Sequence, residues 1–200
     1  MDATRLEQQI DFLREVDILK QVQRKSFVSG SRRFENSAEH SWHVALMALV
    51  LSEHAAPPGI DVGRVIKMLL VHDLVEIDAG DTLFYAEAEA HRLQKERELA
   101  AAERLFGLLP MPEGRDLRAL WDEFEARESA EAKFAAAVDR LQPILLNFMS
   151  EGAAWRRYAV TAPEVYAKNR HIADASPELW AFAEQLIDEA VRRGYLKQQI

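Results

Sequence analysis

The chain has 200 residues, of which 48% are apolar and 29% are charged, a composition typical of globular proteins. This length suits one domain with a sizeable core better than two, so we expect a single domain over residues 1–200. The net charge of −8 disfavours a nucleic-acid polymer as partner but leaves room for a small phosphate ester in a local basic pocket. The absence of cysteine excludes disulfides, thiolate metal ligands and a thiol nucleophile.

The sequence carries no sign of membrane insertion. The N-terminal stretch MDATRLEQQIDFLREV is charged throughout and lacks the apolar core of a signal peptide. The longest strongly apolar run, VALMALVL at residues 44–51, is far too short to span a bilayer. We therefore expect a cytoplasmic protein without a membrane partner.

The first part of the chain has the periodicity of helices. Apolar residues recur every three to four positions over residues 4–24, which predicts the first helix. The stretch SFVSGSRRFENSAEH that follows is rich in Ser, Gly and Asn and is predicted to be a loop. Asn36 and Glu39 have the spacing of a capping box, so a second helix is expected from Asn36 to about residue 54, where AAPPG ends it.

The middle of the chain is divided by further start and stop signals. Asp61 is a suitable N-cap for a third helix that extends into LLVHDLVE. The segment DAGDT at residues 78–82 predicts a turn. A long, charge-rich helical pattern follows over residues 86–106, and after LLPMPEG another helix is expected to about residue 127.

The last part of the chain is also predicted to be helical. Ser129 can cap a helix that runs through residue 149, with Pro143 expected to kink or interrupt it. The segments TAPE and SPE each place a proline at the first turn of a further helix. No window shows sustained strand alternation, so we expect an all-α bundle of six to eight helices.

The stretch LLVHDLVE at residues 69–76 places three titratable side chains in an otherwise aliphatic run. Burying His72, Asp73 and Glu76 is costly unless they are paired, hydrogen-bonded or bound to a metal. Neighbouring helical residues point about 100° apart, yet both His72 and Asp73 can reach a metal near the end of a helix. Glu76 is four residues after His72 and is expected on the same helical face. The ordinary alternative is a core His and Asp that bond to backbone groups or to a nearby Arg.

Candidate partners for this stretch lie far away in the sequence. His40 and His43 stand three residues apart at the start of the second helix, and spacing alone does not choose between them as metal ligands. Asp139 follows three alanines on an apolar helix, where it is either paired with Arg140 or a metal ligand. Without cysteine, any metal must be held by His, Asp or Glu, which suits Mn, Co, Ni, Fe or Zn.

Four further polar side chains have ordinary roles as well as functional ones. Asp81, in the AGD turn, can be a turn former, a helix cap or a site carboxylate. Arg24, Arg32 and Arg33 lie just before or within the polar loop that precedes His40. Guanidinium groups suit bidentate recognition of phosphate, although a solvated arginine is the simpler explanation for any one of them.

Taken together, the order His, then His-Asp, then Asp resembles the HD-domain superfamily of metal-dependent phosphohydrolases. The resemblance is carried by RRFENSAEHSWHVALMALVL, LLVHDLVEIDAGDT and AAAVDRLQPILLN, within about residues 20–150. The segment ENSAEHSWHVA followed by VHDLVEIDAGD is most similar to the branch of 5'-deoxynucleotidases, which remove phosphate from deoxynucleoside 5'-monophosphates. The resemblance implies one HD domain, with a metal-site core at about residues 20–150 and C-terminal helices at 160–195 packed on it.

The resemblance also implies roles for individual residues. One divalent cation (Mn, Co, Ni, Fe, Zn or Mg) would be held by four residues: His40, His72, Asp73 and Asp139. His43 would then have a packing or supporting role.

The remaining candidates match residues that handle the substrate. Glu76 matches the catalytic acid of the family, and Asp81 matches a second carboxylate that is catalytic or contacts the substrate. Arg24 matches the arginine that contacts the nucleotide, and Arg32 and Arg33 are further candidates for phosphate binding.

These matches predict a metal-dependent phosphomonoesterase that hydrolyses small (deoxy)nucleoside 5'-monophosphates to nucleoside and phosphate. Two alternatives remain open: an HD-type hydrolase of another phosphoester, such as a cyclic nucleotide, nucleoside triphosphate or alarmone, and a helical binding module without catalysis. Some related nucleotidases have an aromatic residue where this chain has Lys25, which is a departure at the nucleotide contact. Related enzymes are often dimers, so a homodimer is expected.

Overall fold

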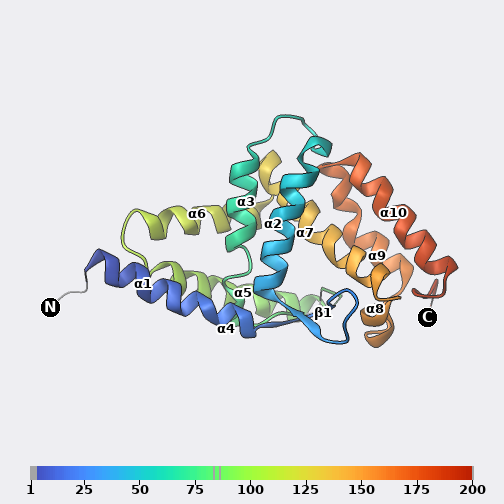
Figure 1. The fold of residues 1–200 in the computed structure, drawn as a ribbon, viewed down its shortest axis with the longest axis horizontal. Coiled ribbons are helices and arrows are strands. Elements are labelled where there is room, and N and C mark those ends of the chain that lie inside the picture. The colour runs from blue at the N-terminus through green and yellow to red at the C-terminus, as the bar shows by residue number, and fades with distance from the viewer. Residues whose placement is uncertain (1–3, 83, 86, 200) are drawn as a thin grey trace.

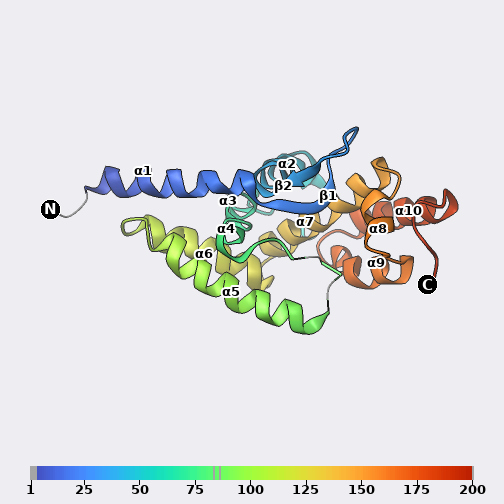
Figure 2. The same ribbon diagram turned by 90° about the horizontal axis from the view of Figure 1, so that it is seen from below.

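The computed structural model describes residues 4–82, 84–85 and 87–199. Three helices form its centre and contact one another: α2 (Ser37–Leu51), α3 (Val62–Val71) and α7 (Ala130–Met149). Figures 1 and 2 show an elongated molecule in which one end is built from α1 (Arg5–Val16), α5 (Ala88–Phe106) and α6 (Glu113–Ala126). The opposite end is built from α8 (Ala153–Arg157), α9 (Ala162–Asn169) and α10 (Pro177–Arg192).

The expected all-α architecture is confirmed. Across the described residues, eight helices have eight residues or more, which lies within the expected six to eight. The short helices α4 (Glu76–Ala79) and α8 and three 3₁₀ segments were not expected; the latter are η1 (Asp17–Gln21), η2 (Ser52–His54) and η3 (Arg170–Asp174). Within the described residues, no helix combines the length and apolar character needed to cross a bilayer.

Several helix starts lie where the sequence places them. The Asn36 side chain accepts a hydrogen bond from the Glu39 amide at 2.9 Å, and the Glu39 carboxylate accepts one from the Asn36 amide at 3.2 Å. Asp61 and Ser129 cap α3 and α7 through their side-chain oxygens. The side chain satisfies an amide that has no partner within the helix, which fixes the first turn.

Two predicted elements differ near the N-terminus. The first helix ends at Val16 and continues as η1, whereas the sequence predicted a helix to residue 24. Part of the predicted loop is an antiparallel hairpin of β1 (Gln23–Phe27) and β2 (Phe34–Asn36). The hairpin escaped prediction because its strands are short and polar, and its pairing is stabilised locally by the stacked rings of Phe27 and Phe34, 4.5 Å apart.

The HD segment also differs from the expected continuous helix. α3 ends at Val71, His72 is its C-cap, and Glu76 begins the separate helix α4. His72 and Glu76 therefore do not share one helical face, which corrects the prediction. A second difference is that α7 continues through Pro143 to Met149 without interruption. The start at residue 86 predicted for the fifth helical segment lies outside the described residues, and α5 begins at Ala88.

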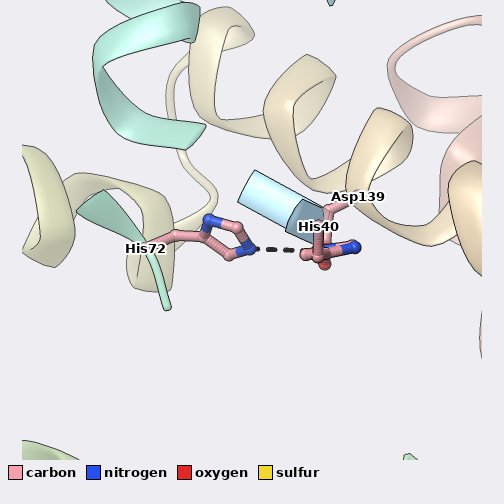
Figure 3. A group of neighbouring side chains, drawn as sticks. All are labelled: His40, His72 and Asp139. Carbon is pink, nitrogen blue, oxygen red and sulfur yellow. Dashed lines mark hydrogen bonds and ion pairs between the residues drawn. The ribbon is translucent and has the colours of Figure 1, made fainter. Parts of the chain in front are cut away.

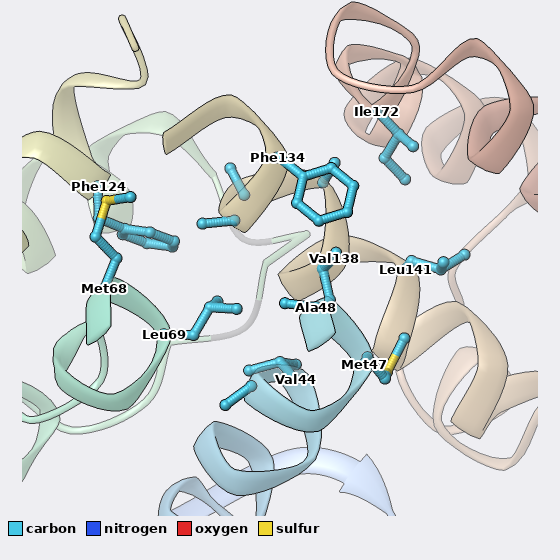
Figure 4. Packing of buried hydrophobic residues seen from close by; sticks show 14 of the residues in the cluster. Val44, Met47, Ala48, Met68, Leu69, Phe124, Phe134, Val138, Leu141 and Ile172 are labelled. Carbon is cyan, nitrogen blue, oxygen red and sulfur yellow. The ribbon is translucent and has the colours of Figure 1, made fainter. Parts of the chain in front are cut away.

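A continuous apolar core holds the central helices together. Figure 4 shows Val44 and Ala48 of α2 facing Leu69 of α3 and Val138 of α7, with Phe124 of α6 beside them. All five side chains are at most 4% exposed. The run of alanines at residues 135–137 of α7 is also buried, and small side chains allow helices to approach closely. The core therefore provides a rigid frame around the polar residues that α2, α3 and α7 bring together.

Candidate metal centre and cavity

Three side chains from separate helices converge at the centre of the molecule. His40 lies on α2, His72 caps α3 and Asp139 lies on α7, and all three are at most 5% exposed. His40 Nε2 is 2.8 Å and His72 Nε2 is 3.5 Å from Asp139 Oδ1. Figure 3 shows a ring nitrogen of His72 directed toward the side chains of His40 and Asp139, which overlap in this view. One donor atom from each lies within 4.8 Å of the others, a spacing that one metal ion could bridge.

Asp73 lies at the edge of this group. Its Oδ1 is 3.1 Å from His72 Nε2, and its Oδ2 is 4.0 Å from His40 Nε2. The same Oδ2 accepts a hydrogen bond from Arg24 Nη1 at 2.6 Å. Because α3 ends before His72, the two neighbours leave the helix in directions that both face the group. The arginine holds one carboxylate oxygen and leaves the other directed at the histidine.

The hydrogen bonds behind the two imidazoles fix which nitrogen faces the centre. His72 Nδ1 donates to the Leu69 carbonyl oxygen at 2.8 Å, which leaves Nε2 facing the carboxylates. The amide nitrogen of Gln142 lies 2.6 Å from a carboxylate oxygen of Glu35, which can only accept. The Gln142 carbonyl oxygen must then accept from His40 Nδ1, 3.2 Å away. In the neutral forms of both rings, a lone pair on Nε2 points at Asp139.

This donor set fits a divalent cation. Two imidazole nitrogens and carboxylate oxygens are the ligands that suit Mn, Co, Ni, Fe or Zn. With Nδ1 protonated, His40 Nε2 and Asp139 Oδ1 are two acceptors at 2.8 Å, and such a pair is stable only with a proton or a cation between them. His72 Nε2 is buried without a hydrogen-bond partner within the described residues, although it lies 3.1 Å from Asp73 Oδ1 and 3.5 Å from Asp139 Oδ1.

The carboxylates of the cluster favour a bound positive charge, either a proton or a cation. Burial alone would lower the pKa of His72, but Asp73 and Asp139 outweigh it and raise the pKa to about 9. Burial alone would raise the pKa of Asp139, but Arg140, His40 and His72 lower it well below its usual range. Without a metal, the cluster therefore holds a proton on His72 at neutral pH, and a metal must displace it.

Glu76 stands beside the cluster but is not one of the three converging groups. Its Oε2 accepts a hydrogen bond from Ser37 Oγ at 2.6 Å, and its Oε1 is 3.9 Å from Arg24 Nη1. Burial and, to a lesser extent, the charge of Asp73 raise the pKa of Glu76 to about 8, and Arg24 offsets only part of this rise. A carboxyl group with a pKa near neutrality is suited to take up or release a proton.

Arg24 and Asp81 complete the polar wall. Burial alone would lower the pKa of Arg24, but Asp73 and Glu76 outweigh it and raise the pKa, so Arg24 stays charged. Asp81 follows Gly80, whose φ of +73° allows the turn after α4. Burial raises the pKa of Asp81, whose carboxylate lies 3.9 Å from the ammonium group of Lys25.

A cavity of about 320 Å³ opens onto this wall. Its lining includes the charged residues His72, Asp73, Glu76, Asp81 and Arg24. It also includes aromatic and amide side chains, called here the aromatic wall: Phe84, Tyr85, Trp155, Tyr158, Asn147 and Asn169. Charged and aromatic side chains in one cavity suit a ligand that has both a phosphate and a planar ring.

Three candidate residues predicted from the sequence lie outside both the cluster and the cavity lining. Arg33 is exposed and forms a bidentate pair with Glu39 at 2.7 and 2.8 Å, and Arg32 is exposed too. Neither is among the residues that line the cavity. His43 lies behind the cluster, where its Nδ1 is 3.2 Å from the Gln142 amide nitrogen.

Sequence reasoning missed three buried residues that support the cluster: Glu35, Ser37 and Gln142. Gln142 could have been found, since it lies three residues after Asp139 and so on the same helical face. The sequence offered no such signal for Glu35 and Ser37, which meet their partners across more than 30 residues. The aromatic wall was also missed, since no local signal in the sequence places Trp155 and Tyr158 beside residues that lie more than 70 positions earlier.

The fold and the cluster define an α-helical protein with a histidine and carboxylate centre suited to a metal ion. The sequence model of the HD domain matches residues 16–180, and the chain therefore belongs to the HD-domain family. This confirms the superfamily resemblance on which the predictions were based.

Known relatives agree with this assignment. The human protein 5'-deoxynucleotidase HDDC2 is 34% identical over 141 residues, which cover 68% of this chain and 65% of the relative. The chain thus matches slightly less than two thirds of that relative's length. A solved structure of a "predicted metal-dependent phosphohydrolase" from Magnetospirillum magnetotacticum MS-1 is 50% identical, with a TM-score of 0.91 and 96% of both chains covered. The PH0347 protein of Pyrococcus horikoshii shares the fold, at 22% identity, a TM-score of 0.61, and 92% and 99% coverage.

Proposed function

We propose that the protein is a metal-dependent phosphohydrolase that converts (deoxy)nucleoside 5'-monophosphates to nucleoside and inorganic phosphate. The observation that carries the proposal is the cavity, which joins the His72 and Asp73 end of the cluster to an aromatic wall. Hydrolysis of a nucleotide needs both a charged centre for the phosphoryl group and a surface for the base. The name of the human relative supports this substrate class.

One divalent cation is proposed at the cluster, with His40, His72, Asp73 and Asp139 as its ligands. The metal would be Mn, Co, Ni, Fe, Zn or Mg. The tautomers set by Leu69 O and Gln142 direct both Nε2 atoms to this point. When bound, such a cation supplies Lewis-acid polarisation of a phosphoryl oxygen and makes nearby water more acidic.

Side chains of the protein would transfer the proton and position the substrate. Glu76, held by Ser37 and with a raised pKa, would orient the attacking water and accept its proton. Asp81 would assist it or contact the sugar from the turn after α4. Arg24 would hold Asp73 in place and present its guanidinium to the phosphate. Arg32 and Arg33 stay predictions from the sequence, which no contact in the cavity supports.

A nucleotide panel with several divalent metals tests the proposal. Released phosphate, pyrophosphate and nucleoside would be measured separately, because another phosphoester substrate would give a different product set. We expect phosphate and nucleoside from deoxynucleoside 5'-monophosphates. Release of pyrophosphate from triphosphates, or hydrolysis of cyclic nucleotides or alarmones alone, would support the alternative hydrolase instead. Absence of both turnover and bound metal would support a binding module.

Two variants separate binding of the metal from catalysis. Asp73→Asn should lose metal affinity together with activity, because it removes a charged ligand. Glu76→Ala should keep the metal and lose activity by a factor of about 10² to 10⁴, typical of a general base. Asp11→Asn, an exposed position on α1, is the matched control and should behave like the wild type. Full activity of Glu76→Ala on every substrate would refute its role.

A homodimer of single HD domains is the proposed assembly. The exposed side of α2 carries Trp42, Leu46, Leu49 and Val50, each at least 43% exposed. Large apolar side chains grouped on one helix face are common where subunits meet. Light scattering of the wild type and of Trp42→Ser with Leu49→Ser tests this, and a monomeric wild type would contradict it.

A further inference from the structure

Arg140 is a cation on the cavity wall to which the proposed mechanism gives no role. It follows Asp139 on α7, and its Nη2 lies 2.9 Å from Asp139 Oδ2. The ring of Phe84 covers its guanidinium face, with Cζ 4.0 Å from the ring centroid. Its Nε is buried and has no hydrogen-bond partner within the described residues. The guanidinium is thus held in place by two neighbours while at least one donor is left unused.

Arg127 brings a second guanidinium to the same cavity. It ends α6 with a left-handed backbone, at φ +52°, and lines the cavity together with Arg140. Burial lowers the pKa of Arg127, and the charge of Arg140 lowers it further than Asp139 and Glu125 can offset. Two partly desolvated cations that repel each other are stabilised by an anion placed between them.

The position of the two arginines relative to the metal cluster indicates which anion would bind. Asp139 lies between the cluster and Arg140, since its Oδ1 faces His40 and His72 while its Oδ2 faces Arg140. A group bound at the cluster would therefore lie about one carboxylate width from the Arg140 guanidinium. Arg24 reaches the cluster from β1, through Asp73. A tetrahedral phosphate has enough oxygens to contact the metal centre and more than one guanidinium group.

We propose that Arg140, supported by Arg127, binds the reacting phosphate group of the substrate from α7, in addition to Arg24. The assignment rests on the proposed function, because it names the residues that recognise that substrate's phosphate. Arg140 and Arg127 would thereby make the phosphate contacts that the sequence analysis predicted for Arg32 and Arg33. Arg140 contacts the substrate directly, and Arg127 adds charge and a second contact at the outer edge of the same group.

Binding of inorganic phosphate tests the assignment without turnover. Calorimetry on protein loaded with one equivalent of Mn²⁺ would compare the wild type with Arg140→Gln, Arg127→Gln and Arg140→Lys. Arg115→Gln, 65% exposed on α6, is the matched control. We expect Arg140→Gln to weaken phosphate binding about tenfold or more, the loss of a charge-assisted hydrogen bond, and Arg127→Gln to weaken it less. Arg140→Lys should have an intermediate affinity for phosphate, because lysine keeps the charge but lacks the planar guanidinium that donates two parallel hydrogen bonds.

The affinity for Mn²⁺ separates a phosphate contact from a supporting role. It should stay within about twofold in Arg140→Gln, whereas a large loss would show that Arg140 only holds Asp139 in place and would overturn the proposal. Unchanged phosphate binding in both Gln variants would also overturn it. If Arg140→Gln does not fold, the result for Arg127→Gln decides alone.

Competition with the nucleotide shows whether the phosphate binds at the reacting group. Phosphate should compete with the nucleotide in the wild type, and non-competitive inhibition would contradict the proposal. A wild type that binds phosphate but hydrolyses no nucleotide would refute the proposed function while leaving this subsite intact.

Discussion

Replacing Gln142 with methionine should damage the metal centre without touching a ligand. The side chain is fully buried, and its amide joins Glu35, His40 and His43 at 2.6, 3.2 and 3.2 Å. Methionine keeps the length of the side chain and removes both donor and acceptor. Glu35 and the Nδ1 proton of His40 then lose partners in a region from which water is excluded.

The structure allows the size of the effect to be worked out. Each buried polar group left without a partner costs about 1–3 kcal/mol, so the two together should lower the free energy of unfolding by about 2–6 kcal/mol. The tautomer of His40 is no longer fixed, and loss of such a supporting partner typically weakens metal binding about 10- to 100-fold.

Two measurements check this prediction. Urea unfolding of the metal-free protein gives the change in stability, and competition with a chelator of known affinity gives the change in metal binding. Gln185→Met, at an exposed position of α10, is the matched control and should change neither. A Gln142→Met protein with wild-type metal affinity would refute the role assigned to the amide, even if its stability fell.

Two further predictions concern protons and packing. The pKa of Glu76 is raised from 4.5 to about 8 and that of His72 from 6.5 to about 9, so the folded metal-free protein binds protons more tightly than the unfolded chain. Its stability should therefore fall as pH rises, from about 4.5 to 8 through Glu76 and from about 6.5 to 9 through His72. Metal affinity should rise between about pH 6.5 and 9, because the His72 proton becomes easier to displace. Urea unfolding and metal titrations at several pH values check both trends, and a flat pH dependence would contradict them. Gly152→Ala should lower the free energy of unfolding by about 2–4 kcal/mol, because φ is +74° and a Cβ would overlap the Tyr195 carbonyl. Gly194→Ala, with φ +73° and open space around it, isolates the backbone cost and should lose only about 1 kcal/mol in the same urea titration.

Local signals in the sequence accounted for most of the helices. The capping pair Asn36 and Glu39 and the caps Asp61 and Ser129 each act within one turn, so the residues that decide a helix start are neighbours in the chain. The end of α3 at Val71 was missed because LLVHDLVE continues the apolar pattern, while the chain turns there to direct polar groups inward. Tertiary contacts outweigh local preference at such a position.

The candidate site was predictable only as far as its motifs extend. The family pattern pointed to His40, His72 and Asp139, and the structure brings these three together. The pairing of Glu35 with Gln142 and of Ser37 with Glu76 depends on contacts across 107 and 39 positions, which periodicity cannot register. For the same reason, the sequence could not tell which arginines would face the cavity.

The cavity is assembled from two stretches of chain that make different contributions. The charged side chains that line it come from residues up to Arg140, whereas Trp155, Tyr158 and Asn169 belong to the later stretch around α8 and α9. Substitutions in that later stretch can reshape the space for a ligand without altering a single donor atom at the cluster. A gene encoding this fold could therefore acquire new substrate preferences by drift in the codons after Asn147, while selection on the chemistry holds the residues up to Gln142 constant.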